Sequence, residues 1–213
     1  MAQNLDLLNR GDMIVIDMFR HNLFGQYTIH DLMKRLSKKS YIRIFEAVKK
    51  LNKMGIIKIE PKGRAKICSI NLDETKAMAY LSLLDELDSQ SRKYIPMDNV
   101  KELLDSLPLS FFTFIITGSY AAGKQTKNSD LDIVVLAEDG IDKKRILAIL
   151  ISKGRTMIPE IHPYVFTRSE FLQMLADKET NYGKLFFHKR LIVSGAENYY
   201  MMVKEAIRNG FRG

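Results

Sequence analysis

Residues 111–136, FFTFIITGSYAAGKQTKNSDLDIVVL, decide the fold of this chain. The stretch opens with an apolar and β-branched run at 111–117, which is too short to cross a bilayer and stops at a Gly-Ser pair. This pattern is typical of a buried strand that enters a tight turn. A second apolar run begins at the sequence DLD, residues 130–132, and continues to residue 136. We therefore expect two buried strands joined by a turn and a polar connection.

The two aspartates of the second run are expected to form an acidic pair. Side chains alternate across a strand with period two, so the carboxylates of Asp130 and Asp132 project from the same face. Two like charges so close repel each other unless a cation lies between them. Mg²⁺ suits such a pair, because one or two carboxylates hold it together with substrate phosphates.

The turn at Gly118-Ser119 is expected to bind phosphate. A turn that leaves a strand exposes backbone N–H groups and a hydroxyl, which are natural donors to a phosphate chain. Gly118 lets the backbone approach a ligand closely, because it has no Cβ. The sequence therefore predicts a phosphate site beside a metal site.

The residues of this turn and of the acidic pair resemble the signature of the DNA polymerase β-like nucleotidyltransferase superfamily, in its minimal, prokaryotic form. That signature is Gly-Ser, a spacer of about ten residues and Asp-x-Asp, and here ten residues separate Ser119 from Asp130. Ala121, Gly123 and Ser129 also fit the minimal form. The resemblance implies an α/β (α+β) domain at residues 98–213, with a small mixed sheet flanked by helices.

The resemblance also implies a reaction. A nucleoside monophosphate would pass from a nucleoside triphosphate, with ATP as the expected substrate, to a hydroxyl acceptor on a small molecule, an RNA end or a protein. Asp130 and Asp132 would be catalytic and would hold Mg²⁺ or Mn²⁺. Gly118 and Ser119 would hold the triphosphate, and Lys124 and Lys127 of the connection would add positive charge.

Glu160 is the expected third carboxylate of this site. In the family, an acidic residue on the strand after Asp-x-Asp completes the metal site and helps to deprotonate the attacking hydroxyl. Glu160 shares one face of the expected strand 156–166 with His162, and the prolines of this strand favour an edge position. Because Pro159 and Pro163 distort the register, the alternative is a solvated glutamate on a chain that binds nucleotide without transferring it.

The N-terminal part predicts three helices, at residues 6–22, 28–36 and 40–53, and then two β-like runs, 56–60 and 65–71. Thr28 and Ser40 are expected N-caps. In the third helix, Ile44, Phe45 and Val48 are expected to face the interior. The order of these elements resembles the winged helix-turn-helix.

The resemblance to a winged helix implies binding to duplex DNA through the start of the third helix and the tip of the hairpin. The residues expected to contact DNA are Lys38, Lys39, Tyr41, Arg43, Lys62 and Arg64. Charge agrees with this expectation, because residues 1–73 carry 14 Lys and Arg against 7 Asp and Glu, whereas the remainder carries 19 against 18. The alternative is a solvated basic face on a domain used for homodimerisation or for docking a partner protein.

Composition and spacing divide the chain into residues 1–73, the winged helix-turn-helix domain, residues 74–97, a connecting helix and linker, and residues 98–213, the nucleotidyltransferase domain. With 46% hydrophobic and 27% charged residues, the composition is that of an ordinary globular protein. The single Cys68 excludes an internal disulfide, and the scattered histidines suggest no zinc site. The sequence shows neither a signal-like segment nor a membrane span, so we expect a cytoplasmic protein.

A second interpretation belongs to another class of protein. The chain would be a DNA-binding transcriptional regulator, antitoxin-like, whose nucleotidyltransferase fold serves as a ligand sensor or a dimer module.

Overall fold

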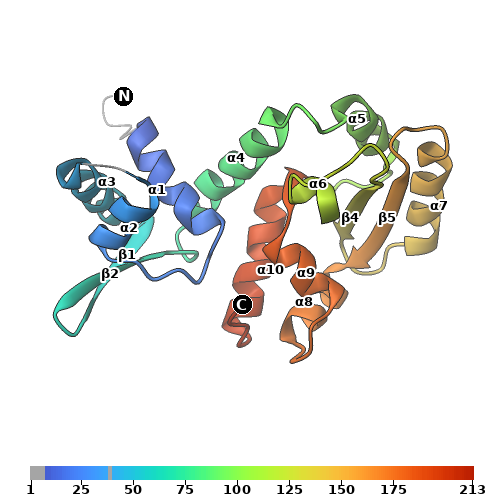
Figure 1. Ribbon diagram of the computed structural model, residues 1–213. Coiled ribbons are helices and arrows are strands. Elements are labelled where there is room, and N and C mark those ends of the chain that lie inside the picture. Colours follow the sequence, from blue (N-terminus) through green and yellow to red (C-terminus); the bar gives the residue numbers. More distant parts are fainter. Residues whose placement is uncertain (1–7, 38–39) are drawn as a thin grey trace, which may run out of the picture. The chain divides into compact units, whose positions relative to one another are not determined.

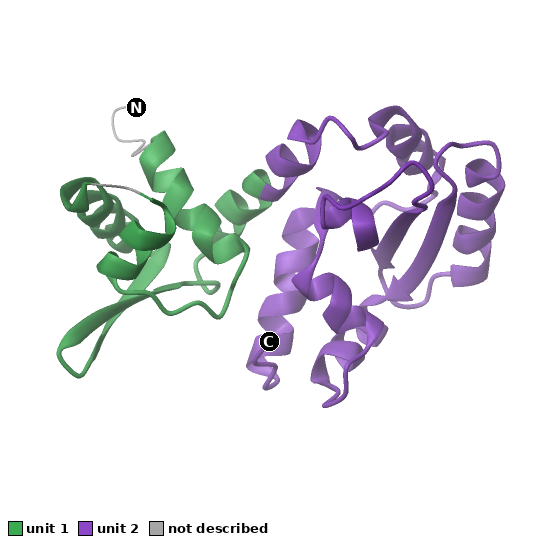
Figure 2. Cartoon of the chain, in the orientation of Figure 1, with its two compact units in different colours: residues 1–84 green, residues 85–213 purple. Residues whose placement is uncertain are grey.

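The computed structural model of the chain describes residues 8–37 and 40–213 (Figure 1). These residues form two compact units, Met1–Leu84 and Asp85–Gly213 (Figure 2). The boundary lies inside helix α4 (Thr75–Ser91), so the helix expected to connect the domains is shared between the units. No helix within the described parts of the chain has the length and apolar character needed to span a bilayer.

In its described residues, the first unit contains three helices, the first part of α4 and a two-stranded antiparallel sheet (Figure 1). Its elements are α1 (Arg10–Arg20), α2 (Ile29–Arg35), α3 (Tyr41–Lys53), β1 (Ile57–Lys62) and β2 (Ala65–Ile70). Asn9, Thr28 and Ser40 cap the three helices by accepting backbone N–H groups, which confirms the predicted caps at Thr28 and Ser40. The order of elements is the predicted one, and the assignment to the winged helix-turn-helix is taken up below as a proposal.

The second unit is a mixed four-stranded sheet flanked by helices, as predicted (Figure 1). Its elements are α5 (Met97–Ser106), β3 (Phe112–Ile116), α6 (Gly118–Ala121), β4 (Leu131–Ala137), α7 (Lys143–Gly154), β5 (Ile161–Thr167), α8 (Arg168–Ala176), α9 (Tyr182–His188), β6 (Leu191–Ser194) and α10 (Ala196–Arg208). The strand order is β5-β4-β3-β6, with β4 parallel to β5 and the other neighbours antiparallel. Strand β5 lies at an edge, where a proline within a strand is tolerated.

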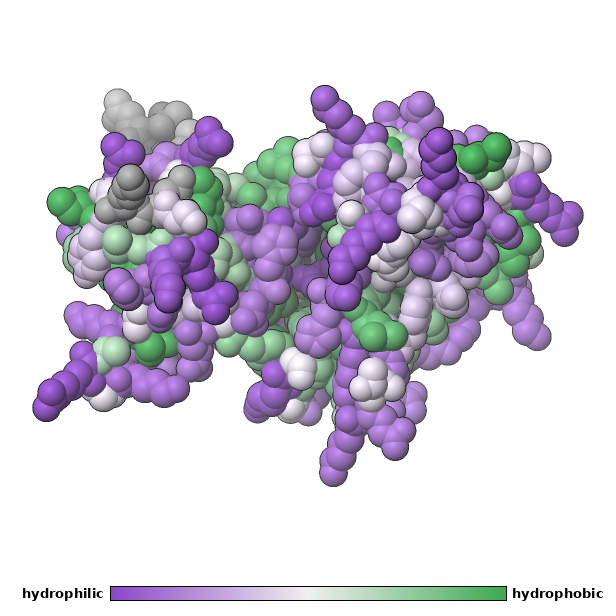
Figure 3. Space-filling view, in the orientation of Figure 1, coloured by the Kyte–Doolittle hydropathy of each residue, from purple (hydrophilic) through white to green (hydrophobic). Residues whose placement is uncertain are grey.

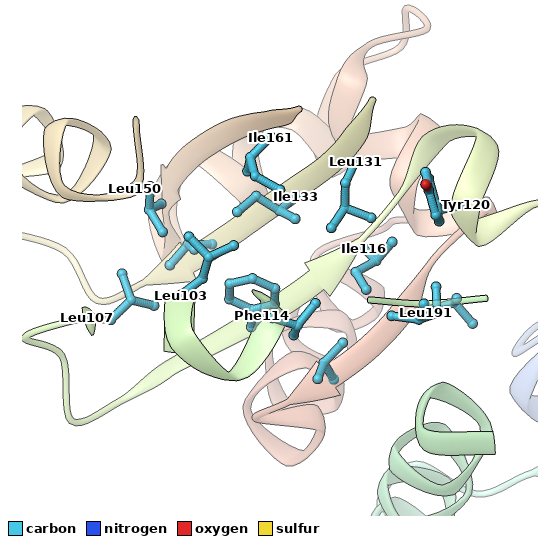
Figure 4. Packing of buried hydrophobic residues seen from close by; sticks show 14 of the residues in the cluster. Leu103, Leu107, Phe114, Ile116, Tyr120, Leu131, Ile133, Leu150, Ile161 and Leu191 are labelled. Carbon is cyan, nitrogen blue, oxygen red and sulfur yellow. The ribbon is translucent and has the colours of Figure 1, made fainter. Parts of the chain in front are cut away.

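Apolar side chains on both faces of the sheet explain why β3 and β4 are continuous apolar runs. Phe114 and Ile133 pack in one cluster with Leu103 of α5 and Leu150 of α7 (Figure 4). Because side chains alternate along a strand, Ile115 lies on the opposite face of the sheet from Phe114. Helices α8 and α10 contact the sheet on that face. A buried side chain of this size stabilises the fold by about 1.5–3 kcal/mol, so both faces contribute to holding the two strands in place.

The second half of α4 is held by a buried polar contact within the second unit. The Tyr200 hydroxyl of α10 donates a hydrogen bond to the carboxylate of Asp85, and both side chains are buried. Burial raises the pKa of Tyr200, and the neighbouring Asp85 raises it further. This contact explains why the second unit begins at Asp85 rather than at the end of the helix.

Candidate functional site

The Gly-Ser turn lies directly against the acidic pair. Gly118 begins α6 with φ of +65°, and a Cβ built on it would lie 2.1 Å from Oδ2 of Asp132. The backbone N–H of Thr117 donates to the carbonyl of Asp132 at 3.0 Å, which joins the end of β3 to the start of β4. Glycine is therefore required here for two reasons, the left-handed backbone and the close approach of a carboxylate.

The acidic pair lies at the start of β4, as the sequence predicts. Asp130 precedes the strand, Asp132 is its second residue, and their side chains are 43% and 28% exposed. Burial raises the pKa of Asp132, His162 opposes this rise and Asp130 adds to it. The pair is thus half-buried and electrostatically strained in the way that a cation would relieve.

His162 lies opposite Asp132 across the parallel pair of β4 and β5. Its Nδ1 lies 3.7 Å from Oδ2 of Asp130 and 3.9 Å from Oδ1 of Asp132, and its Nε2 lies 3.8 Å from Oε1 of Glu160. The sequence interpretation did not include His162 in the site. The signal was present, because the expected strand 156–166 placed Glu160 and His162 on one face. The expected start of that strand was wrong, since β5 begins at Ile161 and Glu160 lies just before it.

Glu160 comes to the acidic pair from the segment before β5. The backbone N–H of Leu131 donates to the carbonyl of Glu160 at 2.8 Å, which aligns the two segments. Asp130, Glu160 and His162 offer ligand atoms that all lie within 4.8 Å of one another. Carboxylate oxygens with one imidazole nitrogen suit a divalent cation, so the residues present fit the metal that such a site requires.

A pocket of about 750 Å³ opens beside the turn and the acidic pair. Four of the residues predicted for the site line it: Gly118, Ser119, Lys124 and Asp132. Lys127, which was predicted with Lys124, is exposed on the connection outside the described lining. The volume is sufficient for a nucleotide-sized ligand.

Three further lysines line this pocket and were missed from the sequence: Lys178, Lys184 and Lys189. Lys184 also donates from Nζ to the backbone carbonyls of Asp177 and Glu179, which orders the segment before α9. A pocket with four lysines and one aspartate carries an excess of positive charge, and this suits a polyanionic ligand. No local motif marks these three lysines in the sequence. They come close to the Gly-Ser turn because β6 pairs with β3, which is a contact between distant parts of the chain.

Two tyrosines form an apolar wall of the same pocket. The rings of Tyr164 and Tyr182 have centroids 4.6 Å apart, and both side chains line the pocket. Burial raises the pKa of Tyr182 well above its ordinary value, and the nearby Asp132 adds to the rise. Tyr182 therefore stays neutral, and aromatic faces of this kind can stack on a nucleobase.

The residues predicted to contact DNA are exposed where the structure describes them. Lys38 and Lys39 lie outside the described residues. Arg43 and Arg64 are exposed, and Lys62 donates from Nζ to Oε1 of Gln26 at 3.3 Å. The space-filling view shows a hydrophilic surface at the tip of the β1–β2 hairpin (Figure 3).

The outer face of α3 is more apolar than predicted. Phe45, expected to face the interior, is 39% exposed, and its ring stacks on that of Tyr41 with centroids 6.0 Å apart. The expectation was wrong because Ile44, Ala47, Val48 and Leu51 form the buried face of α3. Phe45 lies at the edge of that face, next to Tyr41 one turn earlier. Ile42 is 72% exposed on the same helix.

Comparison with known proteins assigns the segment that carries this site. Residues 88–186 match the model of the nucleotidyltransferase domain, so the chain contains a domain of this class of enzymes. The matched segment includes the Gly-Ser turn, the acidic pair and Glu160, and it ends before Lys189.

Two solved structures are similar to this chain. One is described as the crystal structure of the toxin-antitoxin with AMP-PNP, with 20% identity over 54% of this chain and 86% of that chain and a TM-score of 0.35. The other is TrmBL2, an archaeal chromatin protein with a novel mode of DNA binding, with 11% identity over 97% of this chain and 94% of that chain and a TM-score of 0.29. No curated protein matches the chain.

Proposed function

We propose that the second unit transfers a nucleoside monophosphate from a nucleoside triphosphate, ATP in the first instance, to a hydroxyl acceptor. One observation carries the proposal: a single pocket combines the Gly-Ser turn, Asp132 of the acidic pair and four lysines. A phosphate-binding turn and cations beside carboxylates are what a metal–triphosphate complex requires.

Different residues of the site would bind the triphosphate, the base and the metal ion. The backbone and hydroxyl of Ser119 and the lysines would hold the triphosphate, and Tyr164 and Tyr182 would stack on the base. Asp130 and Asp132, with Glu160 as the predicted third carboxylate, would hold Mg²⁺ or Mn²⁺. The ion, when bound, neutralises charge that develops on the phosphate oxygens.

The chemical step would be an in-line displacement. The acceptor oxygen forms a bond to the α-phosphorus, the bond from that phosphorus to the bridging oxygen of the β-phosphate breaks, and pyrophosphate leaves. Glu160 would take the proton of the acceptor hydroxyl. Its carboxylate is 75% exposed, so an acceptor can reach it from solvent.

The test uses triphosphates labelled at the α-phosphate, with Mg²⁺ or Mn²⁺ and a panel of RNAs, proteins and small hydroxyl compounds. The wild-type chain should label an acceptor, and Asp132→Asn should abolish the labelling. Calorimetry should show that triphosphate binding depends on the divalent ion and that Asp130→Ala removes this dependence. Equal triphosphate affinity with the ion and with a chelator would contradict the proposed metal site. No labelling across the panel would favour the alternative interpretation, a DNA-binding transcriptional regulator.

A second function is supported by the first unit. We propose that it binds duplex DNA as a winged helix-turn-helix, because Lys62 and Arg64 lie at the exposed end of a hairpin, where cations have little structural use. This binding would target the enzyme or regulate it.

A further inference from the structure

We propose that His162 is itself a ligand of the divalent cation, and that the site therefore takes a transition-metal ion such as Mn²⁺ in preference to Mg²⁺. The inference rests on the proposed function, since it concerns the ion of the same site. It differs from the three-carboxylate site that the sequence predicts, because the position opposite Asp132 on β5 carries an imidazole.

The separations of the donor atoms fit this role. Nδ1 of His162 lies 3.7 Å from the Asp130 carboxylate and 3.9 Å from the Asp132 carboxylate. In an octahedral site with bonds of about 2.1 Å, adjacent ligand atoms are about 3.0 Å apart and opposite ones about 4.2 Å. The observed separations fall between these values, so an ion can contact Nδ1 of His162 together with an aspartate carboxylate after small side-chain movements, and Asp130 is the aspartate whose ligand atom lies within 4.8 Å of those of both His162 and Glu160.

The two ring nitrogens of His162 face different carboxylates. Nε2 faces Oε1 of Glu160 at 3.8 Å, and Nδ1 faces the aspartates. A cation on the aspartate side would take the electron pair of Nδ1, and the ring proton would then lie on Nε2, beside Glu160. Nδ1 is therefore the ligand atom that the geometry favours.

Ligand chemistry then decides which ion is preferred. Mg²⁺ prefers an all-oxygen octahedral shell and keeps several waters, whereas imidazole is a ligand for transition-metal ions. Mn²⁺ accepts carboxylates, imidazole and phosphate oxygens in the same octahedral shell. His162 is 46% exposed, so its ring is accessible to an ion from solvent.

A different role for His162 makes the opposite prediction. A protonated imidazole would offset the charge of Asp130 and Asp132 in place of the ion. Its removal would then strengthen the binding of every divalent ion, Mn²⁺ included.

The experiment uses the full chain as wild type, His162→Asp and His162→Gln, with His30→Gln as the matched control. His30 is an exposed histidine of α2 in the other unit. Binding of Mn²⁺ is measured from the electron paramagnetic resonance of the free ion, and Mg²⁺ is measured by competition. Pulsed spectra of bound Mn²⁺ report whether a nitrogen is coordinated.

We expect the wild type and His30→Gln to bind Mn²⁺ at least about tenfold more tightly than Mg²⁺ and to show coupling to one imidazole nitrogen. His162→Asp should lose that coupling and reduce the preference by about tenfold, because it restores an all-carboxylate site. His162→Gln should lose the coupling and bind Mn²⁺ more weakly.

Two results would overturn the inference: bound Mn²⁺ without nitrogen coupling in the wild type, or an unchanged Mn²⁺ to Mg²⁺ ratio in His162→Asp. The nitrogen coupling is read in the wild type, so the test stands even if a variant fails to fold. Either result with intact Mg²⁺-dependent triphosphate binding would leave the proposed function in place. Failure of the wild type to bind triphosphate with either ion would instead count against the proposed function.

Discussion

Gly118 and Asp132 meet more closely than any side chain on the glycine would allow. The left-handed backbone at Gly118 aims the turn toward the acidic pair, and the missing Cβ leaves the space that Oδ2 of Asp132 occupies. The proposed phosphate site and the proposed metal site thus meet in one contact between two residues that lie 14 positions apart in the sequence.

Gly118→Ala should destabilise the second unit by about 2–4 kcal/mol, of which roughly 1–2 kcal/mol comes from the left-handed backbone and the rest from the clash with Asp132. Gly140→Ala is the matched control, because Gly140 has φ of +85° and no atom within 4 Å of a built Cβ. Denaturant unfolding of both variants measures the difference. Equal losses of stability would show that the close approach to Asp132 has no energetic weight.

Glu160→Gln should lower acceptor labelling by at least about 100-fold with near-normal triphosphate binding, because general-base catalysis contributes about 10²–10⁴-fold. The amide has nearly the same size and shape as the carboxylate, so the variant removes the charge and the base without opening space in the site. Single-turnover labelling and calorimetry separate the two effects. Glu102→Gln, at an exposed ion pair on α5, is the control, and unchanged labelling in Glu160→Gln would make another residue the base.

At the scale of elements, α9 and the segments around it supply most of the positive charge of the pocket. Lys178 lies before α9, Lys184 within it and Lys189 after it. Asn181 caps the start of this helix, and its side chain accepts the backbone N–H of Lys184 at 3.1 Å. A capped, packed helix can hold cations toward a triphosphate, whereas a loose loop would leave them in solvent.

Lys178→Ala and Lys189→Ala should each weaken ATP binding about two- to fivefold, because partly exposed charge pairs contribute up to about 1 kcal/mol. The loss should shrink at high salt, where charges on the surface are screened. Lys153→Ala on α7, outside the pocket, is the control. Titrations at two salt concentrations test the prediction, and losses in Lys153→Ala as large as in the others would contradict it.

The helix and strand signals of the sequence were reliable where they were local. Strands β3 and β4 and the N-caps at Thr28 and Ser40 follow from side chains a few residues apart. Phe45 was expected in the interior and is exposed instead. Helical periodicity identifies the buried face, but it does not decide whether a residue at the edge of that face is buried. Lys124 was predicted from the motif, but Lys178, Lys184 and Lys189 could not be found, because their position depends on which distant strand pairs with β3.

At the scale of the whole molecule, charge separates the two units. Residues 1–84 carry 15 Lys and Arg against 8 Asp and Glu, an excess of seven, and residues 85–213 carry 18 against 17, an excess of one. A polyanion outside the nucleotide pocket is therefore the expected partner of the N-terminal unit.

The full chain should bind duplex DNA with a log-log salt slope of about −4 to −5, which corresponds to roughly 4–6 neutralised phosphates. The double variant Lys62→Ala and Arg64→Ala should reduce the slope by about one or two units, because each phosphate contact contributes about 0.9. The control is the double variant Lys101→Ala and Lys153→Ala in the other unit. Binding that ignores salt, or no binding at low salt, would favour protein docking at the exposed Tyr41, Ile42 and Phe45 of α3.

The late position of β6 in the chain also sets when the pocket can exist during synthesis. Strand β3 pairs with β4 and with β6, and Lys189 lies just before β6. A ribosome that has exposed the chain only through β5 presents the acidic pair and the Gly-Ser turn without α9 and its lysines. Non-local pairing forms slowly and domains fold as units, so the proposed affinity for triphosphate would arise only once β6 has paired with β3. Nucleotide in the cell would thus stabilise completed chains and leave unfinished ones unbound.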